Sequence, residues 1–146
     1  MIKDNSAQKR GKKKDFLQII ANTIVCNLGM TQEIGLTKGK MGISLFLYKY
    51  AKKSGIKEYE STANLLLDEI INNLYKSMDK SVTDGLAGIG IGLITLLSEG
   101  YVEDTDENDS LDEVDNLLFQ EIVKKDITVS DFFSSAIYFR FIRHFE

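Results

Sequence analysis

A glycine-rich stretch in the second half of the chain limits the folds that this sequence can adopt. It covers residues 84–92, contains four glycines and leads directly into an apolar run over residues 93–97. Each glycine would destabilise an exposed helix by roughly 1 kcal/mol relative to alanine. We therefore expect a buried helix here, with another part of the chain packed closely against Gly85, Gly88, Gly90 and Gly92.

The glycine pattern repeats along the chain. In the first copy, 46 residues upstream, the matching positions are Thr37, Gly39, Gly42 and Ile43; in the second copy they are Thr83, Gly85, Gly88 and Ile89. We call residues 37–43 and 83–89 the first and second glycine frames. A third copy starts at Val129, but it has Phe132 in place of Gly85 and Ser135 in place of Gly88. A period of about 46 residues is typical of helical-hairpin arrays, in which each unit needs neighbours to bury its apolar face.

Outside the frames, the sequence favours helices throughout. It has no proline that would stop a helix, and no stretch alternates with the period of two that is typical of a half-buried strand. Apolar residues recur instead at every third or fourth position, as in amphipathic helices. The predicted fold class is all-α, with about six helices in three hairpin repeats, each pairing an amphipathic outer helix with an apolar inner one. The predicted helices cover residues 15–27, 39–54, 57–77, 86–98, 110–122 and 129–145.

Composition predicts one domain preceded by a tail. The chain of 146 residues is 43% hydrophobic and 27% charged, which are globular values. Residues 1–14 are basic and almost without apolar side chains, so we expect a disordered tail there and a single α-hairpin repeat domain over residues 15–146. A nucleic-acid-binding or membrane-binding arm is the less favoured interpretation of the tail, because no aromatic residues are interleaved with its lysines.

Charge and targeting signals indicate a cytoplasmic protein. A net charge of -4 gives no overall attraction to nucleic acid or to anionic lipid. There is no apolar run long enough to span a membrane and no signal-peptide pattern. The single cysteine, Cys26, cannot form an internal disulfide, which fits a reducing compartment.

No cluster of residues predicts a catalytic or metal site. Cys26 and His144 are the only cysteine and histidine, and a zinc site needs about three protein ligands. The acidic segment over residues 104–112 has alternating oxygen ligands, but Asp109 and Asp115 stand where an EF-hand needs glycine and glutamate. We assign no catalytic residue, metal ligand or cofactor to this chain. The glycines interpreted as structural are Gly39, Gly42, Gly85, Gly88, Gly90 and Gly92.

At the glycine frames, the sequence resembles the lanthionine synthetase C-like family. The resemblance is carried by residues 35–47, 84–92 and 99–103, and it extends over nearly the whole chain after the basic tail. It implies an α/α toroid, a ring of helical hairpins whose inner helices open on glycine-rich turns. This chain would then be a truncated member that supplies roughly the first three of about seven repeats.

The resemblance also implies a role in maturing ribosomally made peptides, as in lantibiotic biosynthesis. Such enzymes add a cysteine thiol to a dehydrated serine or threonine, using a zinc ion held by two cysteines and a histidine from later hairpins. No residue here matches those ligands, so we expect the chain to bind a precursor peptide or a partner subunit without cyclase activity of its own. Two alternatives stay open: half of a zinc-dependent cyclase completed by another polypeptide, and a helical-repeat interaction module of unrelated role.

An incomplete ring would leave an open edge. A stack of three hairpins exposes apolar surface that a closed ring would cover. Three occupants fit this edge: a second copy of the chain, a separately encoded partner subunit, or the aromatic third unit folded back as a cap. The aromatic residues of that unit are Phe132, Phe133, Tyr138, Phe139, Phe141 and Phe145.

Overall fold

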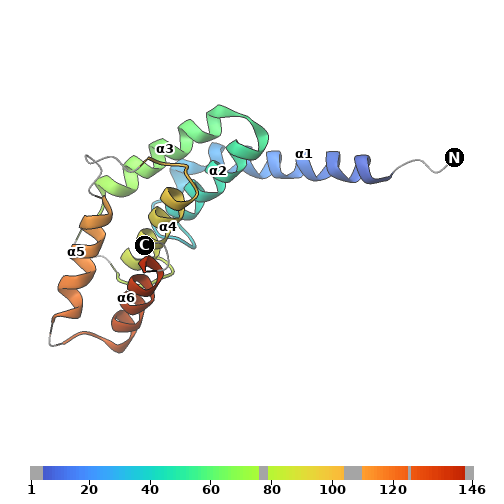
Figure 1. The fold of residues 1–146 in the computed structure, drawn as a ribbon. Coiled ribbons are helices and arrows are strands. Elements are labelled where there is room, and N and C mark those ends of the chain that lie inside the picture. Colours follow the sequence, from blue (N-terminus) through green and yellow to red (C-terminus); the bar gives the residue numbers. More distant parts are fainter. Residues whose placement is uncertain (1–4, 76–78, 104–109, 125, 144–146) are drawn as a thin grey trace. The chain divides into compact units, whose positions relative to one another are not determined.

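A computed structural model of the chain describes residues 5–75, 79–103, 110–124 and 126–143. Every regular element in these residues is helical, which confirms the predicted all-α class (Figure 1). The elements are α1 (Asn5–Cys26), the short 3-10 helix η1 (Leu28–Met30), α2 (Lys40–Ser54), α3 (Lys57–Asn72), α4 (Leu86–Ser98), α5 (Ser110–Ile122) and α6 (Val129–Ile142). No helix in these ranges is long and apolar enough to cross a membrane.

The chain divides into two compact units, Met1–Met30 and Thr31–Glu146. The first unit contains α1 and η1, and the second contains the remaining helices. Helix α1 begins at Asn5, inside the stretch predicted to be a disordered tail. The physical reason is that lysine, arginine and glutamine are good helix formers, and extending an existing helix costs much less than nucleating one. Residues 1–4 lie outside the described residues.

In the second unit, α4 is the central helix. It packs against α5 and α6 and also contacts α2, which forms a hairpin with α3 (Figure 1). Nine of the 13 residues of α4 are buried, so it is an inner helix as its composition predicts. The helices of the third predicted pair, α5 and α6, are in contact, and α6 also packs on α4.

The α2–α3 hairpin is closed by a tight turn and by polar contacts along its length. Gly55 adopts the left-handed conformation at φ 74°, and its N–H donates to the carbonyl of Ala51. Further along, the Ser44 hydroxyl donates to the carbonyl of Ala63 at 2.9 Å. The buried Tyr48 donates to the side chain of Asn64, and burial raises the pKa of its hydroxyl to about 12.

Helix α3 is shorter than predicted. The apolar pattern favours a helix to residue 77, but α3 ends at Asn72. The side-chain amide of Asn73 donates to the carbonyl of Glu69 at 2.7 Å, which satisfies one of the carbonyls left free at the helix end. Asparagine is also a weaker helix former than the residues before it.

Candidate functional site

Both glycine frames belong to loops that fold back over the first turn of the following helix. In the first, the N–H of Lys40 donates to the carbonyl of Glu33 at 2.9 Å; in the second, the N–H of Leu86 donates to the carbonyl of Asp79 at 2.8 Å. Both bonds connect residues seven apart in the chain. The sequence repeat is therefore also a repeat of backbone geometry.

The first glycine of each frame is the N-cap of an inner helix and lies against its own loop. A Cβ added to Gly39 would lie 2.7 Å from the carbonyl oxygen of Glu33, and one added to Gly85 would lie 2.3 Å from that of Asp79. Both separations are shorter than real Cβ atoms show. A side chain at either position would push the loop away from the helix.

The second glycine of each frame lies against the same loop. A Cβ on Gly42 would lie 2.2 Å from the carbonyl oxygen of Leu36, and one on Gly88 would lie 2.2 Å from that of Val82. The contacting atoms belong to the backbone, which cannot rotate away as a side chain can. The equal distances indicate that the two turns are built in the same way.

The remaining two glycines of α4 face its neighbouring helices. A Cβ on Gly90 would lie 2.3 Å from the ring of Tyr138 on α6, and one on Gly92 would lie 2.5 Å from the side chain of Met41 on α2. Tyr138 and Met41 are both fully buried. These glycines allow α2 and α6 to pack closely against α4.

The third copy of the frame is built differently. Helix α6 begins at Val129, three residues before Phe132, and the side chain of its N-cap Thr128 accepts a hydrogen bond from the N–H of Asp131. Phe132 is 48% exposed, whereas Ser135 is fully buried and its hydroxyl has no hydrogen-bond partner among the described residues. Among the described residues before α6, no backbone bond folds a loop back over its first turn as in the other two units.

The loops of the first two frames are bonded to each other. The backbone N–H of Thr37 donates to the carbonyl of Thr83 at 2.9 Å, and the hydroxyl of Thr37 donates to the carboxylate of Asp84 at 2.7 Å. The N–H of Lys38 donates to the same carboxylate oxygen at 3.1 Å. The hydrogen bond from Thr37 holds the pKa of the Asp84 carboxyl below its ordinary value. We call this set of contacts the loop joint.

A small polar cavity lies beside the loop joint. It has a volume of about 350 Å³. Lys40 in its wall is buried and forms an ion pair with Glu69 of α3. The other acidic residues of the wall are Glu33, Asp79 and Asp84. Across the described ranges, no three histidine, cysteine, aspartate or glutamate side chains form a group that could hold a metal ion.

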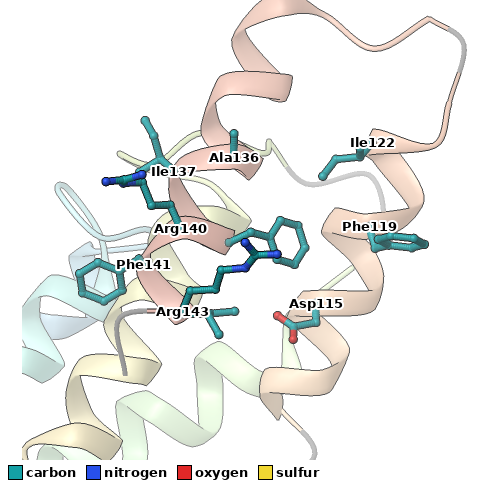
Figure 2. Close-up of a pocket in the computed structure, with 10 residues that line it drawn as sticks. Asp115, Phe119, Ile122, Ala136, Ile137, Arg140, Phe141 and Arg143 are labelled. Carbon is teal, nitrogen blue, oxygen red and sulfur yellow. The ribbon is translucent and has the colours of Figure 1, made fainter. Parts of the chain in front are cut away.

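A larger cavity lies between α5 and α6, and we call it the α5–α6 groove (Figure 2). Its volume is about 1050 Å³. Figure 2 shows Arg143 extending from α6 toward α5 at the end that carries Asp115, and Ile122 near the other end. The lining residues are Asp115, Phe119, Ile122, Ala136, Ile137, Phe139, Arg140, Phe141, Ile142 and Arg143.

Large apolar side chains are exposed along the same two helices. On the outer edge of α5, Phe119 is 60% exposed, and on α6 Ile137 is 51% exposed. The others on or next to these helices are Val123, Val129, Phe132 and Phe133. A surface that combines a groove with several exposed apolar side chains is typical of an interaction site.

One hydrogen bond connects the two helices that form the groove. The hydroxyl of Tyr138 donates to the carboxylate of Asp115 at 2.5 Å and so connects α6 to α5. Burial raises the pKa of the Tyr138 hydroxyl, and the hydrogen bond to Asp115 raises it further. Tyr138 therefore stays neutral and keeps α6 anchored on α4 and α5, while the opposite side of α6 faces outward.

Of the single cysteine and the single histidine considered from sequence, the structure describes only Cys26. Cys26 is an exposed free cysteine at the end of α1. His144 and the acidic residues 104–109 lie outside the described residues.

Comparison with protein-family models, curated proteins and solved structures gives no match to this chain. The resemblance to the lanthionine synthetase C-like family therefore stays a prediction, as does closure of the helices into a toroid.

Two features of the site are missed by the sequence reasoning. Only the sequence repeat points to the loop joint. If the two inner helices are neighbours, their equivalent loops lie side by side, and Thr37 and Asp84 carry groups that can form a hydrogen bond. The position of Arg140 and Arg143 beside a groove is not predictable from sequence, because a lone charge at a helix end is usually solvated.

Proposed function

We propose that this chain is a binding domain of the lanthionine synthetase C-like type. It takes part in maturing ribosomally made peptides by binding a precursor peptide or a partner subunit, and it does not form thioethers alone. The resemblance to the family is supported by α2 and α4, which each begin directly after a glycine-containing turn and have Gly39 and Gly85 as their N-caps. Support for a binding role comes from the α5–α6 groove.

The observation that carries the binding role is the exposed apolar surface of α5 and α6. These two helices present the groove, with Phe119 and Ile137 along its two edges. Another polypeptide segment that supplies apolar side chains would bury this surface, and burial contributes roughly 25 cal/mol per Å² of apolar area.

A titration tests this function. The probe is a fluorescently labelled short peptide that contains one dehydroalanine and one cysteine, and the readout is fluorescence anisotropy. We expect saturable binding that Phe119→Glu and Ile137→Glu each abolish, because a carboxylate at either edge would have to be desolvated. The matched control is Leu65→Glu on α3, which also replaces an exposed apolar residue, 71% exposed, and is expected to leave binding unchanged. Equal binding by all variants would contradict the assignment of the groove.

The same samples separate binding from cyclisation. Thioether formation consumes the cysteine thiol, so alkylation of the peptide after incubation counts the thiols that remain. We expect no loss of thiol with this chain alone, with or without added zinc. Thiol loss together with stoichiometric zinc on the chain would instead support the alternative of a zinc-dependent cyclase.

A further inference from the structure

The α5–α6 groove has two chemically different ends. Helices α5 and α6 run antiparallel, so the start of α5 lies beside the end of α6 (Figure 1). That end carries Asp115 and Arg143, while Arg140, one turn earlier on α6, extends away from α5 (Figure 2). The other end, where the chain passes from α5 to α6, is lined by Ile122 (Figure 2).

A binding partner with both acidic and basic side chains fits the charged end of the groove best. Arg140 and Arg143 are exposed and belong to neither of the ion pairs seen among the described residues, Lys40–Glu69 and Lys49–Glu99. Carboxylates in an occupant would therefore be favourable here. Asp115 lies at the same end, and Asp112 lies one turn earlier on the same edge of α5. A purely acidic segment would meet these carboxylates, so the best occupant carries cations as well.

A second copy of the chain meets this requirement. If a two-fold axis runs parallel to α5 and α6, the outer edge of α6 in one copy meets the outer edge of α5 in the other copy. The charged ends of the two grooves then lie at the same end of the dimer. Arg140 and Arg143 would then face the acidic end of α5 in the second copy. Ile137 would face Phe119 of the second copy, so apolar surface meets apolar surface.

We propose that the α5–α6 groove is the interface of a symmetric homodimer, in which α5 and α6 of two copies form a four-helix bundle. The inference rests on the proposed function in that it takes this groove to be a binding surface, and it names a second copy as the resting occupant, which a precursor peptide would have to displace. The inward side of α6 needs no rearrangement, because Tyr138 stays packed on Gly90 and bonded to Asp115. Four helices around a shared apolar core are a stable arrangement.

Charge reversal with native mass spectrometry tests the dimer. One variant combines Arg140→Glu with Arg143→Glu, and the other is Asp112→Lys. Each should raise the dissociation constant of its own homodimer about 100-fold, since like charges then face each other across the interface. Mixed together, the two variants should form a heterodimer, because each reversed charge meets an opposite charge in the other chain. The control, Lys53→Glu with Lys57→Glu, reverses two exposed lysines away from the groove and should dimerise as the wild type does.

Each outcome decides between the possibilities. Restored pairing in the mixture would support the interface even if each variant alone is less stable, because a folding defect cannot be repaired by mixing. A dimer that the groove variants leave intact would overturn the inference. A chain that stays monomeric at all concentrations but binds the peptide through the groove would overturn the dimer and leave the proposed function in place. A monomer that binds no peptide would overturn both.

Discussion

Alanine at the second glycine of each frame tests the packing on which the array depends. A Cβ on Gly88 would lie 2.2 Å from the carbonyl oxygen of Val82 and 2.9 Å from its carbonyl carbon, so the loop would have to move. Overpacking of this kind typically costs 1–3 kcal/mol of stability, and we expect Gly88→Ala to cost about 3 kcal/mol because the contacting atoms belong to the backbone. The higher helix propensity of alanine offsets about 1 kcal/mol of this cost. The expected net loss is about 2 kcal/mol.

Thermal unfolding followed by far-UV circular dichroism measures this loss. For a chain of this size, 1 kcal/mol corresponds to roughly 4 °C, so Gly88→Ala should lower the Tm by about 8 °C. Gly42→Ala should match it, because a Cβ there would also lie 2.2 Å from a backbone oxygen. The control is Gly29→Ala, where a Cβ would meet nothing within 4 Å. Its expected effect is within about 0.5 kcal/mol.

Two results would refute the reasoning. If Gly88→Ala unfolds at the same temperature as Gly29→Ala, the loop does not lie against α4 as described. If only one of Gly42→Ala and Gly88→Ala is destabilised, the two frames are not structurally equivalent. In that case, the sequence repeat would not be a repeat of backbone geometry.

Two further predictions concern single side chains. Asp84→Asn should lower the Tm at neutral pH, because folding lowers the pKa of the Asp84 carboxyl and its charged form therefore stabilises the protein. The difference in Tm between wild type and variant should be full above about pH 5. It should disappear as the pH falls through the pKa of Asp84 in the folded protein. A difference that is the same at pH 3 and pH 7 would count against a role for the charge. Tyr138→Phe should destabilise the protein by about 1–2 kcal/mol in denaturant unfolding, since it removes a buried hydrogen bond to a carboxylate. An unchanged unfolding midpoint would show that Tyr138 anchors α6 through its ring alone.

The helices of this protein are predictable from sequence because local signals mark their ends. Glycines stand at the starts of α2 and α4, and Gly55 with a positive φ ends α2. The apolar composition of α4 also predicts its central position, since a helix that is apolar on all sides must be buried. These signals depend only on neighbouring residues and on the cost of exposing apolar surface.

The parts that sequence reasoning misses depend on contacts between distant residues. The bond from Thr37 to Asp84 spans 47 residues, and nothing local to either residue requires it. The buried position of Lys40 is explained by Glu69, which lies 29 residues away on α3. The helical start at Asn5 is missed for a different reason: a composition poor in apolar residues indicates that a segment lacks a core, but it does not exclude a helix.

The third unit shows what happens when the glycines of the frame are lost, and Ser135 provides the test. Its buried hydroxyl has no partner among the described residues, and an unsatisfied polar group of this kind costs about 1–3 kcal/mol. Ser135→Ala removes that cost and favours the helix, so it should raise the free energy of unfolding by at least about 1 kcal/mol.

Ser135→Gly is the informative comparison. Helix α6 already includes the three residues before Phe132, so no returning loop lies against position 135 and glycine brings no packing advantage there. We therefore expect alanine at this position to be more stable than glycine by about 1 kcal/mol in denaturant unfolding. A glycine variant more stable than the alanine variant would mean that a loop does fold back onto α6, as it does onto α2 and α4. The third unit would then continue the array, and the outward surface of α6 would have to be explained in another way.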